Sequence, residues 1–357
     1  MENCKITFYN IDRFGYYRRG HDNPEFGDLA EILDDLREWA FQPDMKLGQT
    51  CTYEVSDKSE RVSYRTFCFD LVRDASSNTY LLTTWNESPS SQGKVASVRG
   101  LDPVGNPEVN LTKIPEDYIP GYATYFWFVP NKDTFATLQF QHNFNGRQSL
   151  EVYLRSYLAT FSKHVASQTI IDSDSINILG YQKTSSHEVC QDLYPQFNSK
   201  PYQRVGQYDY IRNNSQEIRQ VIRKDTLRHS VQQNRELWQR LIQTIGISDH
   251  SPPNEEFEHR FKFTVNHTPS AQELDEIIRF WNEKEHDSKW DDIGFKLRGE
   301  EKIHWLSYSL ARNDFPLNVR RVNDEIVDAR SLLKQLLEHQ EKIFSLLDTY
   351  AESSTLH

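Results

Sequence analysis

Polar and apolar residues alternate in several short runs of this chain, and such a period of two is typical of β-strands. In the first run, residues 4–12, Ile6 and Phe8 fall on one face of the predicted strand. A loop rich in glycine and arginine is expected to follow at 13–20. The same pattern predicts further strands at 50–55, 64–73, 78–85, 122–129, 134–141, 175–181, 261–265, 293–297 and 303–308.

In other segments the apolar residues recur at a period near 3.6, which predicts amphipathic helices. These segments are 29–41, 148–164, 215–246 and 269–284. Asp28 is placed to cap the first of these helices, and Ser270 with Glu273 has the spacing of a capping box at the start of the last. The middle of 215–246 is polar, so this segment is interpreted as one helix or two.

The C-terminal segment predicts one long helix, because its apolar positions step regularly by four and three residues. The seam consists of Val322, Ile326, Ala329, Leu333, Leu336, Gln340, Ile343, Leu347 and Tyr350. A seam of this kind either packs on the helix's own domain or mediates self-association. On the second interpretation a homodimer would form through Ile326, Leu333, Leu336, Ile343 and Leu347.

Together these elements predict an α+β fold of two mixed units with antiparallel meanders and a long C-terminal heptad helix. The expected domains are 1–166, an N-terminal α+β unit, and 167–321, a second α+β unit with a basic helix and a hairpin. Residues 322–351 form the closing helix. Residues 86–121 contain five prolines and little periodicity, so a long surface connection is expected there.

Composition adds constraints on the protein's environment. The 357 residues include 13% aromatics, ample for a core, and no run approaches the 18 apolar residues of a membrane-spanning helix. The first 20 residues lack the continuous apolar stretch of a secretory signal. Four cysteines without a CxxC pair cannot form a disulfide framework, so a reducing cytoplasm is the expected compartment.

The formal net charge is −11, but the charge is unevenly distributed. Residues 200–240 contain nine Lys/Arg and four acids, whereas 249–301 contain seven bases and fourteen acids. A basic stripe of this kind can neutralise backbone phosphates without reading bases. The candidate nucleic-acid contacts are Lys200, Arg204, Arg212, Arg219, Arg223, Lys224 and Arg228, joined by Arg18 and Arg19 of the N-terminal loop. The alternative is a solvated helix face that pairs with the acidic segment.

Motifs for catalysis are weak. Arg223 and His229 have the spacing of the catalytic pair in HEPN-type ribonucleases, where the histidine acts as general base. Asp292, Glu300 and Lys302 imitate the acid and lysine set of metal-dependent nucleases. The pair His187 and Cys190 supplies only half of a zinc site. Phosphate-binding glycine loops and hydrolase motifs are absent from the sequence, so no catalytic centre, metal or small-molecule cofactor is expected.

Three stretches of the chain resemble the RexA-like phage exclusion proteins. They are Phe8-Tyr-Asn-Ile-Asp-Arg-Phe-Gly-Tyr-Tyr17, the predicted hairpin at 125–140 that leads into a helix, and the segment Asp291-Asp-Ile-Gly-Phe-Lys-Leu-Arg followed by the closing helix. A looser likeness is to the DNA-binding subunit of the Kiwa antiphage system. The resemblance implies a two-domain α+β homodimer that binds DNA largely without sequence preference. It also implies a role in antiviral exclusion together with a membrane protein partner.

The sequence therefore favours a non-enzymatic antiphage defence protein that contacts nucleic acid through a segregated basic surface. One alternative is a toxic ribonuclease centred on Arg223 and His229. The other is a protein-interaction module whose acidic face at 249–301 docks a basic partner.

Overall fold

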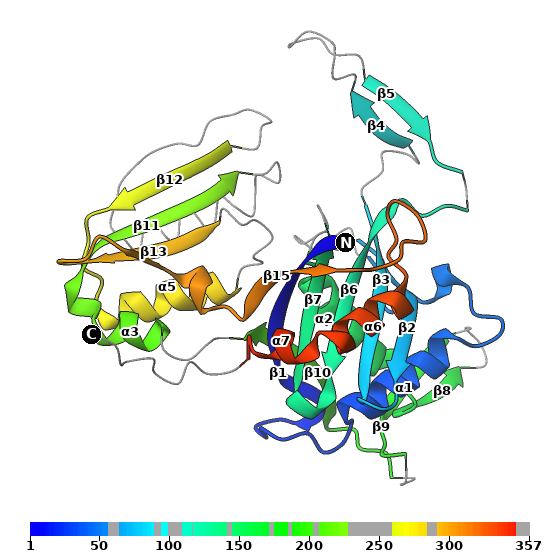
Figure 1. Cartoon of the computed structure of the whole chain (residues 1–357). Coiled ribbons are helices and arrows are strands. Elements are labelled where there is room, and N and C mark those ends of the chain that lie inside the picture. Colours follow the sequence, from blue (N-terminus) through cyan, green and yellow to red (C-terminus); the bar gives the residue numbers. More distant parts are fainter. Residues whose placement is uncertain are drawn as a thin grey trace. The chain divides into compact units, whose positions relative to one another are not determined.

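The structure is a computed structural model, and its chain divides into two compact units (Figure 1). Unit 1 comprises 1–200 and 312–343, and unit 2 comprises 201–311 and 344–357. Unit 2 is thus inserted into the chain of unit 1, whereas the sequence predicted boundaries after 166 and 321. The residues that the structure describes are 1–55, 64–88, 94–98, 109–115, 117–140, 145–170, 175–184, 188–202, 207–227, 259–283 and 291–347.

Unit 1 is built on a seven-stranded sheet whose main path runs β10-β1-β7-β6-β3-β2, with β15 paired to β1. Each pairing with a printed register is antiparallel, and Tyr125 of β6, for example, lies opposite Leu138 of β7. The strands are β1 (Glu2–Arg18), β2 (Thr66–Asp74), β3 (Thr79–Glu87), β6 (Gly121–Val129), β7 (Thr134–Phe140), β10 (Leu193–Pro201) and β15 (Arg312–Leu317). The predicted hairpin at 122–141 is confirmed as β6 and β7, with the 3-10 turn η2 (Pro130–Lys132) between them.

Helices α1 (Leu29–Ala40) and α2 (Arg147–Thr160) pack on one face of this sheet around a large aromatic core. Both helices were predicted. Asp28 caps α1 as expected, because its carboxylate accepts hydrogen bonds from the backbone N–H groups of Ala30 and Glu31. The apolar stripe of α1 is fully buried against the sheet, which explains its helical spacing.

The long C-terminal helix is not what the structure shows. The chain forms α6 (Ala329–Glu338) and α7 (Gln340–Phe344), separated at His339, and 322–328 are not helical. Asp328 stops the helix from starting earlier, because its carboxylate caps α6 by accepting from Ser331 N–H. Residues 348–351 of the predicted helix lie outside the described residues.

Most described positions of the heptad seam are buried within the chain, although Val322 at its start is 65% exposed. Helix α6 packs against β2, β3 and β15, the side of the unit 1 sheet that α1 and α2 leave open. Ile326, Leu333, Leu336 and Ile343 are each at most 5% exposed, and Leu347 is half-buried. This burial favours packing on the chain's own domain over a dimer through these side chains.

Several short elements of unit 1 differ from the prediction. Strand β1 continues to Arg18 through the expected glycine and arginine loop. The surface connection at 86–121 contains a ribbon of β4 (Lys94–Val98) and β5 (Val109–Lys113). A second ribbon pairs β8 (Val165–Ile170) with β9 (Ser175–Tyr181). The strand predicted at 50–55 is a loop after the 3-10 turn η1 (Leu47–Gln49).

Unit 2 has a four-stranded antiparallel sheet of order β12-β11-β13-β14. Its elements are α3 (Gln207–Asn213), η3 (Ser215–Glu217), β11 (Ile218–Leu227), β12 (His259–Val265), α5 (Ala271–Glu283), β13 (Asp292–Leu297), β14 (Ile303–Trp305) and η4 (Leu306–Ser309). Both helices share one core with the sheet and therefore cover the same face. The capping box of α5 is confirmed, because Ser270 and Glu273 exchange hydrogen bonds of 2.7 and 3.2 Å.

The predicted helix at 215–246 is wrong in its first part, where the chain forms β11. A β-bulge between Ile218 and Gln220 explains the misleading period. The bulge adds one residue, so Ile218 and Val221 both enter the core although they are three positions apart, as they would be on a helix. Residues 228–246 lie outside the described residues.

Candidate nucleic-acid interface

The predicted basic stripe is divided between the two faces of β11. Arg223 is 8% exposed, and its guanidinium lies 5.5 Å from the ring of Phe280 on α5. Lys224 is the next residue of the strand and so points to the opposite face. Arg219 is exposed at the bulge. The basic stripe was expected on a helix, but Arg219, Arg223 and Lys224 lie on a strand and do not share one face.

Three of the other predicted contacts are paired with carboxylates of their own unit. Lys200 binds Asp12, Arg212 binds Asp275 and Arg18 binds Asp192, each at 2.9 Å. The cationic side chains of these pairs are 42–59% exposed, so each pair contributes less than about 1 kcal/mol to stability. Arg19 is exposed, and Arg204 and Arg228 lie outside the described residues.

A different set of cations lies together on the unit 2 sheet. The strand registers place Lys224, Lys262 and Lys296 on the face away from α3 and α5. We call this surface the lysine face. Its members are Gln220, Ile222, Lys224, Lys262, Thr264, Asp292, Gly294, Lys296, Ile303 and Trp305. Ile222, Asp292 and Trp305 are each at most 8% exposed. Lys262 is exposed, and Lys224 and Lys296 are half-buried.

Two lysines of the lysine face are direct cross-strand neighbours. Lys224 of β11 pairs in register with Lys262 of β12. Like charges in directly opposed positions of a sheet are destabilising. Across the other side of β11, Lys224 lies opposite Asp292, whose Oδ1 accepts backbone N–H groups of Ile293 and Ser307. Lys224 therefore lies between one cationic and one acidic neighbour, with two lysines and one carboxylate side by side across three strands.

The covered side of unit 2 has the opposite sign. On α5 the side chains of Asp275 and Glu276 are exposed and Glu273 is half-buried, against one exposed cation, Arg279. Among the described residues of 249–301, half of the acids lie on α5, and the lysines Lys262 and Lys296 lie on the opposite face of the sheet. Lysines outnumber acids on that face of a chain whose net charge is −11.

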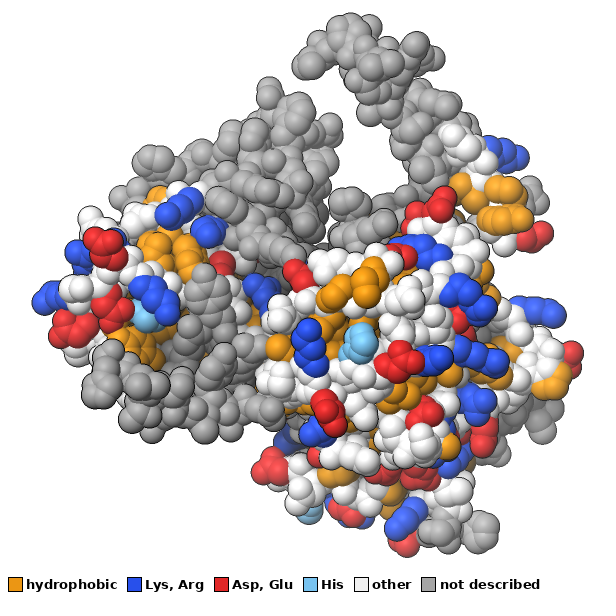
Figure 2. All heavy atoms as spheres, in the orientation of Figure 1, with side chains coloured by type: hydrophobic (Ala, Val, Ile, Leu, Met, Phe, Trp, Pro, Cys, Tyr) orange, Lys and Arg blue, Asp and Glu red, His pale blue; other side chains and the backbone are white. Residues whose placement is uncertain are grey.

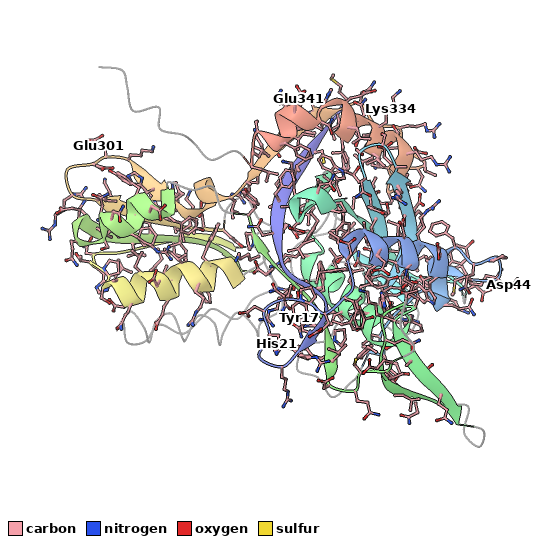
Figure 3. All side chains as sticks on the ribbon, turned by 90° about the horizontal axis from the view of Figure 1, so that it is seen from below. Tyr17, His21, Asp44, Glu301, Lys334 and Glu341 are labelled. Carbon is pink, nitrogen blue, oxygen red and sulfur yellow. The ribbon has the colours of Figure 1, made fainter. Side chains whose placement is uncertain are left out.

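Unit 1 shows no comparable separation on the face visible in Figure 2, where positive and negative side chains are interspersed. Lys334 on α6 and Glu341 on α7 lie on the outer surface of the C-terminal helices (Figure 3). Lys334 also pairs with Glu338 at 3.7 Å, one helical turn away. Alternating signs of this kind suit solvation rather than binding of a polyanion.

The residues suggested for a nuclease do not form one site. Asp292 is the first residue of β13, whereas Glu300 lies in the turn beyond the other end of that strand, which ends at Leu297. Glu300 sits in the turn whose tip is marked by Glu301 in Figure 3, and Lys302 of that turn is exposed. Arg223 lies on a strand rather than on a helix, and His229 and His187 lie outside the described residues.

Glu300 instead joins α3 to the β13–β14 turn. Its carboxylate accepts the hydroxyl of Tyr210 at 2.6 Å and contacts His304 Nε2 at 2.6 Å. These hydrogen bonds, from Tyr210 first and then His304, lower the pKa of Glu300. The contact with the Glu300 carboxylate raises the pKa of Tyr210 in turn. Glu300, Tyr210 and His304 therefore form a structural hydrogen-bond network that links α3 to the β13–β14 turn of unit 2.

Among the described residues, no group of three or more histidine, cysteine or acidic side chains is arranged to hold a metal ion. None of the helices in the described part of the chain combines the length and apolarity needed to cross a bilayer.

Sequence reasoning missed Lys262, Lys296, Gly294 and Trp305. The only sequence signal for a shared face was alternation. Lys262 and Thr264 alternate with the aromatic residues of β12, and Gly294 and Lys296 alternate with the apolar residues of β13. That pattern predicted the strands but not their neighbours in the sheet.

Comparisons of the chain with protein-family models, curated proteins and solved structures found no match.

Proposed function

We propose that this protein binds the sugar-phosphate backbone of nucleic acid through the lysine face of unit 2. The observation that supports this most directly is the opposed pair Lys224 and Lys262 on the side of the sheet away from an acidic helix. Asp292, opposite Lys224 on β13, offsets part of their mutual repulsion, and a polyanion that places phosphates beside the two lysines would relieve the rest. Lysine acts as a point charge, so the face contacts phosphates without selecting a base sequence.

The test is a binding isotherm measured by fluorescence anisotropy on a labelled duplex of about 20 bp, between about 50 and 200 mM salt. We expect log K to fall linearly with log salt, with a slope near −0.9 for each phosphate neutralised. The triple variant Lys224→Gln, Lys262→Gln, Lys296→Gln is expected to lower this slope by roughly two to three and to abolish binding at the higher salt.

A matched control changes the net charge equally but leaves the lysine face intact. Lys46, Lys132 and Lys334 are exposed lysines of unit 1, and their triple change to glutamine should retain the wild-type slope. If both triple variants weaken binding equally, the effect is one of overall charge and the lysine face is not the site. If the wild type does not bind at low salt, the proposed function is wrong.

The sequence resemblance leads us to propose antiphage exclusion as the biological setting, with a homodimer and a membrane protein as partners. The lysine triple variant offers the cellular test. Cells that express the wild type should restrict phage plaque formation, and cells that express the folded triple variant at the same level should not. Equal restriction by both proteins would separate the defence role from the lysine face.

A further inference from the structure

Trp305 lies flat across the neighbouring strand because that strand has no side chain at the facing position. In the pairing of β13 with β14, Gly294 is directly opposite Trp305. A Cβ atom built on Gly294 would lie 2.7 Å from Cε3 and 2.9 Å from Cδ2 of the indole. It would also lie 2.6 Å from Cγ2 of Ile303. A side chain at 294 would therefore require Trp305, Ile303 or both to shift.

The space that Gly294 leaves allows the indole to reach the central strand. Gly294 pairs with Ile222 of β11, two positions from Lys224 and on the same face. The ammonium nitrogen of Lys224 lies 3.9 Å from the centroid of the Trp305 ring. This distance is well within the range in which an aromatic face attracts a cation.

We infer that Trp305 and Gly294 are positioning residues of the phosphate-binding surface, and this inference rests on the proposed function. A lysine has a flexible four-carbon stem, so an anion that captures it must first restrict the side chain. The indole restricts Lys224 before the ligand arrives and holds its charge beside that of Lys262. Pre-ordering of this kind increases affinity without adding a contact.

The same geometry argues against stacking of a nucleic-acid base on the Trp305 ring. Trp305 is 8% exposed, and the ammonium of Lys224 covers its face. Bases bind to aromatic residues by stacking on an open ring face. Trp305 therefore contributes through Lys224 and not by stacking, and the ligand of this part of the surface is phosphate.

The experiment compares three variants by salt-dependent anisotropy on the same duplex. Lys224→Met removes a charge and should reduce the slope by about 0.9. Trp305→Leu keeps every charge, so the slope should stay at the wild-type value while affinity falls by about three- to fivefold at all salt concentrations. Trp305→Phe retains a ring face and should recover part of that loss.

A spectroscopic measurement tests the contact itself. In protein labelled with 5-fluorotryptophan, the ¹⁹F resonance of Trp305, assigned with Trp305→Phe, should shift in Lys224→Met and again when duplex is added to the wild type. Gly294→Ala should displace the ring, shift the same resonance and lower affinity with an unchanged slope. Urea unfolding of each variant identifies any that fail to fold, in which case Trp305→Phe still decides the question.

The outcomes separate the inference from the proposed function. Absence of duplex binding by the wild type overturns both. Binding by the wild type that weakens in Lys224→Met but is unchanged in folded Trp305→Leu overturns the positioning role alone. A reduced slope in Trp305→Leu also overturns it, because the indole would then affect the number of phosphates bound and not the order of one lysine.

Discussion

One ion pair joins the start of β1 to the segment that follows β15. Arg321 forms two hydrogen bonds of 2.6 and 2.7 Å to the carboxylate of Glu2, beside the strand pair β1 and β15. Both side chains are at most 25% exposed. The hydrogen bond from Arg321 holds the pKa of Glu2 below its ordinary value of 4.5. A depressed carboxyl pKa adds stability that is present above the unfolded-state pKa and disappears as the pH falls through the folded-state pKa.

We therefore expect Glu2→Gln to lower the free energy of unfolding by about 1–2 kcal/mol at pH 7. The difference from the wild type should shrink as the pH falls below 4.5 and vanish once Glu2 is protonated in both states. Urea titrations at several pH values measure it. A difference that is constant from pH 7 to the acid limit would show that the ion pair does not cause it.

At this scale, the sequence predicts a residue's role when the role depends on near neighbours along the chain. Asp28, Ser270 and Glu273 were recognisable because a cap acts within three residues. Gly294 and Trp305 were not, because their roles depend on a partner across a strand. The pairing register that brings them together is a property of the sheet.

Among whole elements, strands bounded by clear turns were predicted and irregular ones were not. The hairpin β6–β7 has strongly alternating or continuous apolar arms on either side of a proline and asparagine turn. In β11 the bulge gave a helical spacing to core residues, and the basic residues were then grouped on the wrong face. A β-branched sequence such as Ile218, Val221 and Ile222 favours the strand once sheet neighbours are available.

The start of α6 provides a test of what ended the heptad helix. Asp328→Ala removes the acceptor for Ser331 N–H and should lower the free energy of unfolding by about 1 kcal/mol. Asp328→Asn keeps a cap but loses the ion pair with Arg320, so it should recover most of the stability. Urea unfolding followed by circular dichroism measures both. Equal losses in the two variants would assign the effect to the ion pair instead.

For the molecule as a whole, the order of the two units along the chain follows from the strands that pair with β1. The chain leaves unit 1 after β10, where Lys200 pairs with Asp12, and returns at β15, where Arg312 pairs in register with Thr7. These points are about 17 Å apart along β1. Such a nested order could not be read from the sequence, because both predicted boundaries assumed units that are continuous in the chain.

The close exit and return points predict that unit 1 folds without unit 2. Replacement of 201–311 by about eight glycine and serine residues, with the chain ended after 343, should give a monodisperse protein with cooperative thermal unfolding. Dispersed amide resonances in an NMR spectrum would establish its fold. An aggregated or non-cooperative product would mean that unit 1 requires the inserted unit for stability.

The pairing of β1 with β15 also has a consequence for synthesis on the ribosome. Leu317, the partner of Glu2, is synthesised about 300 residues after it, which takes roughly 15–60 s at ordinary elongation rates. Throughout that interval β1 has no β15 beside it, although β7 has already been made. The nascent chain is therefore a candidate for capture by a chaperone that recognises open β-edges, until β15 has been synthesised.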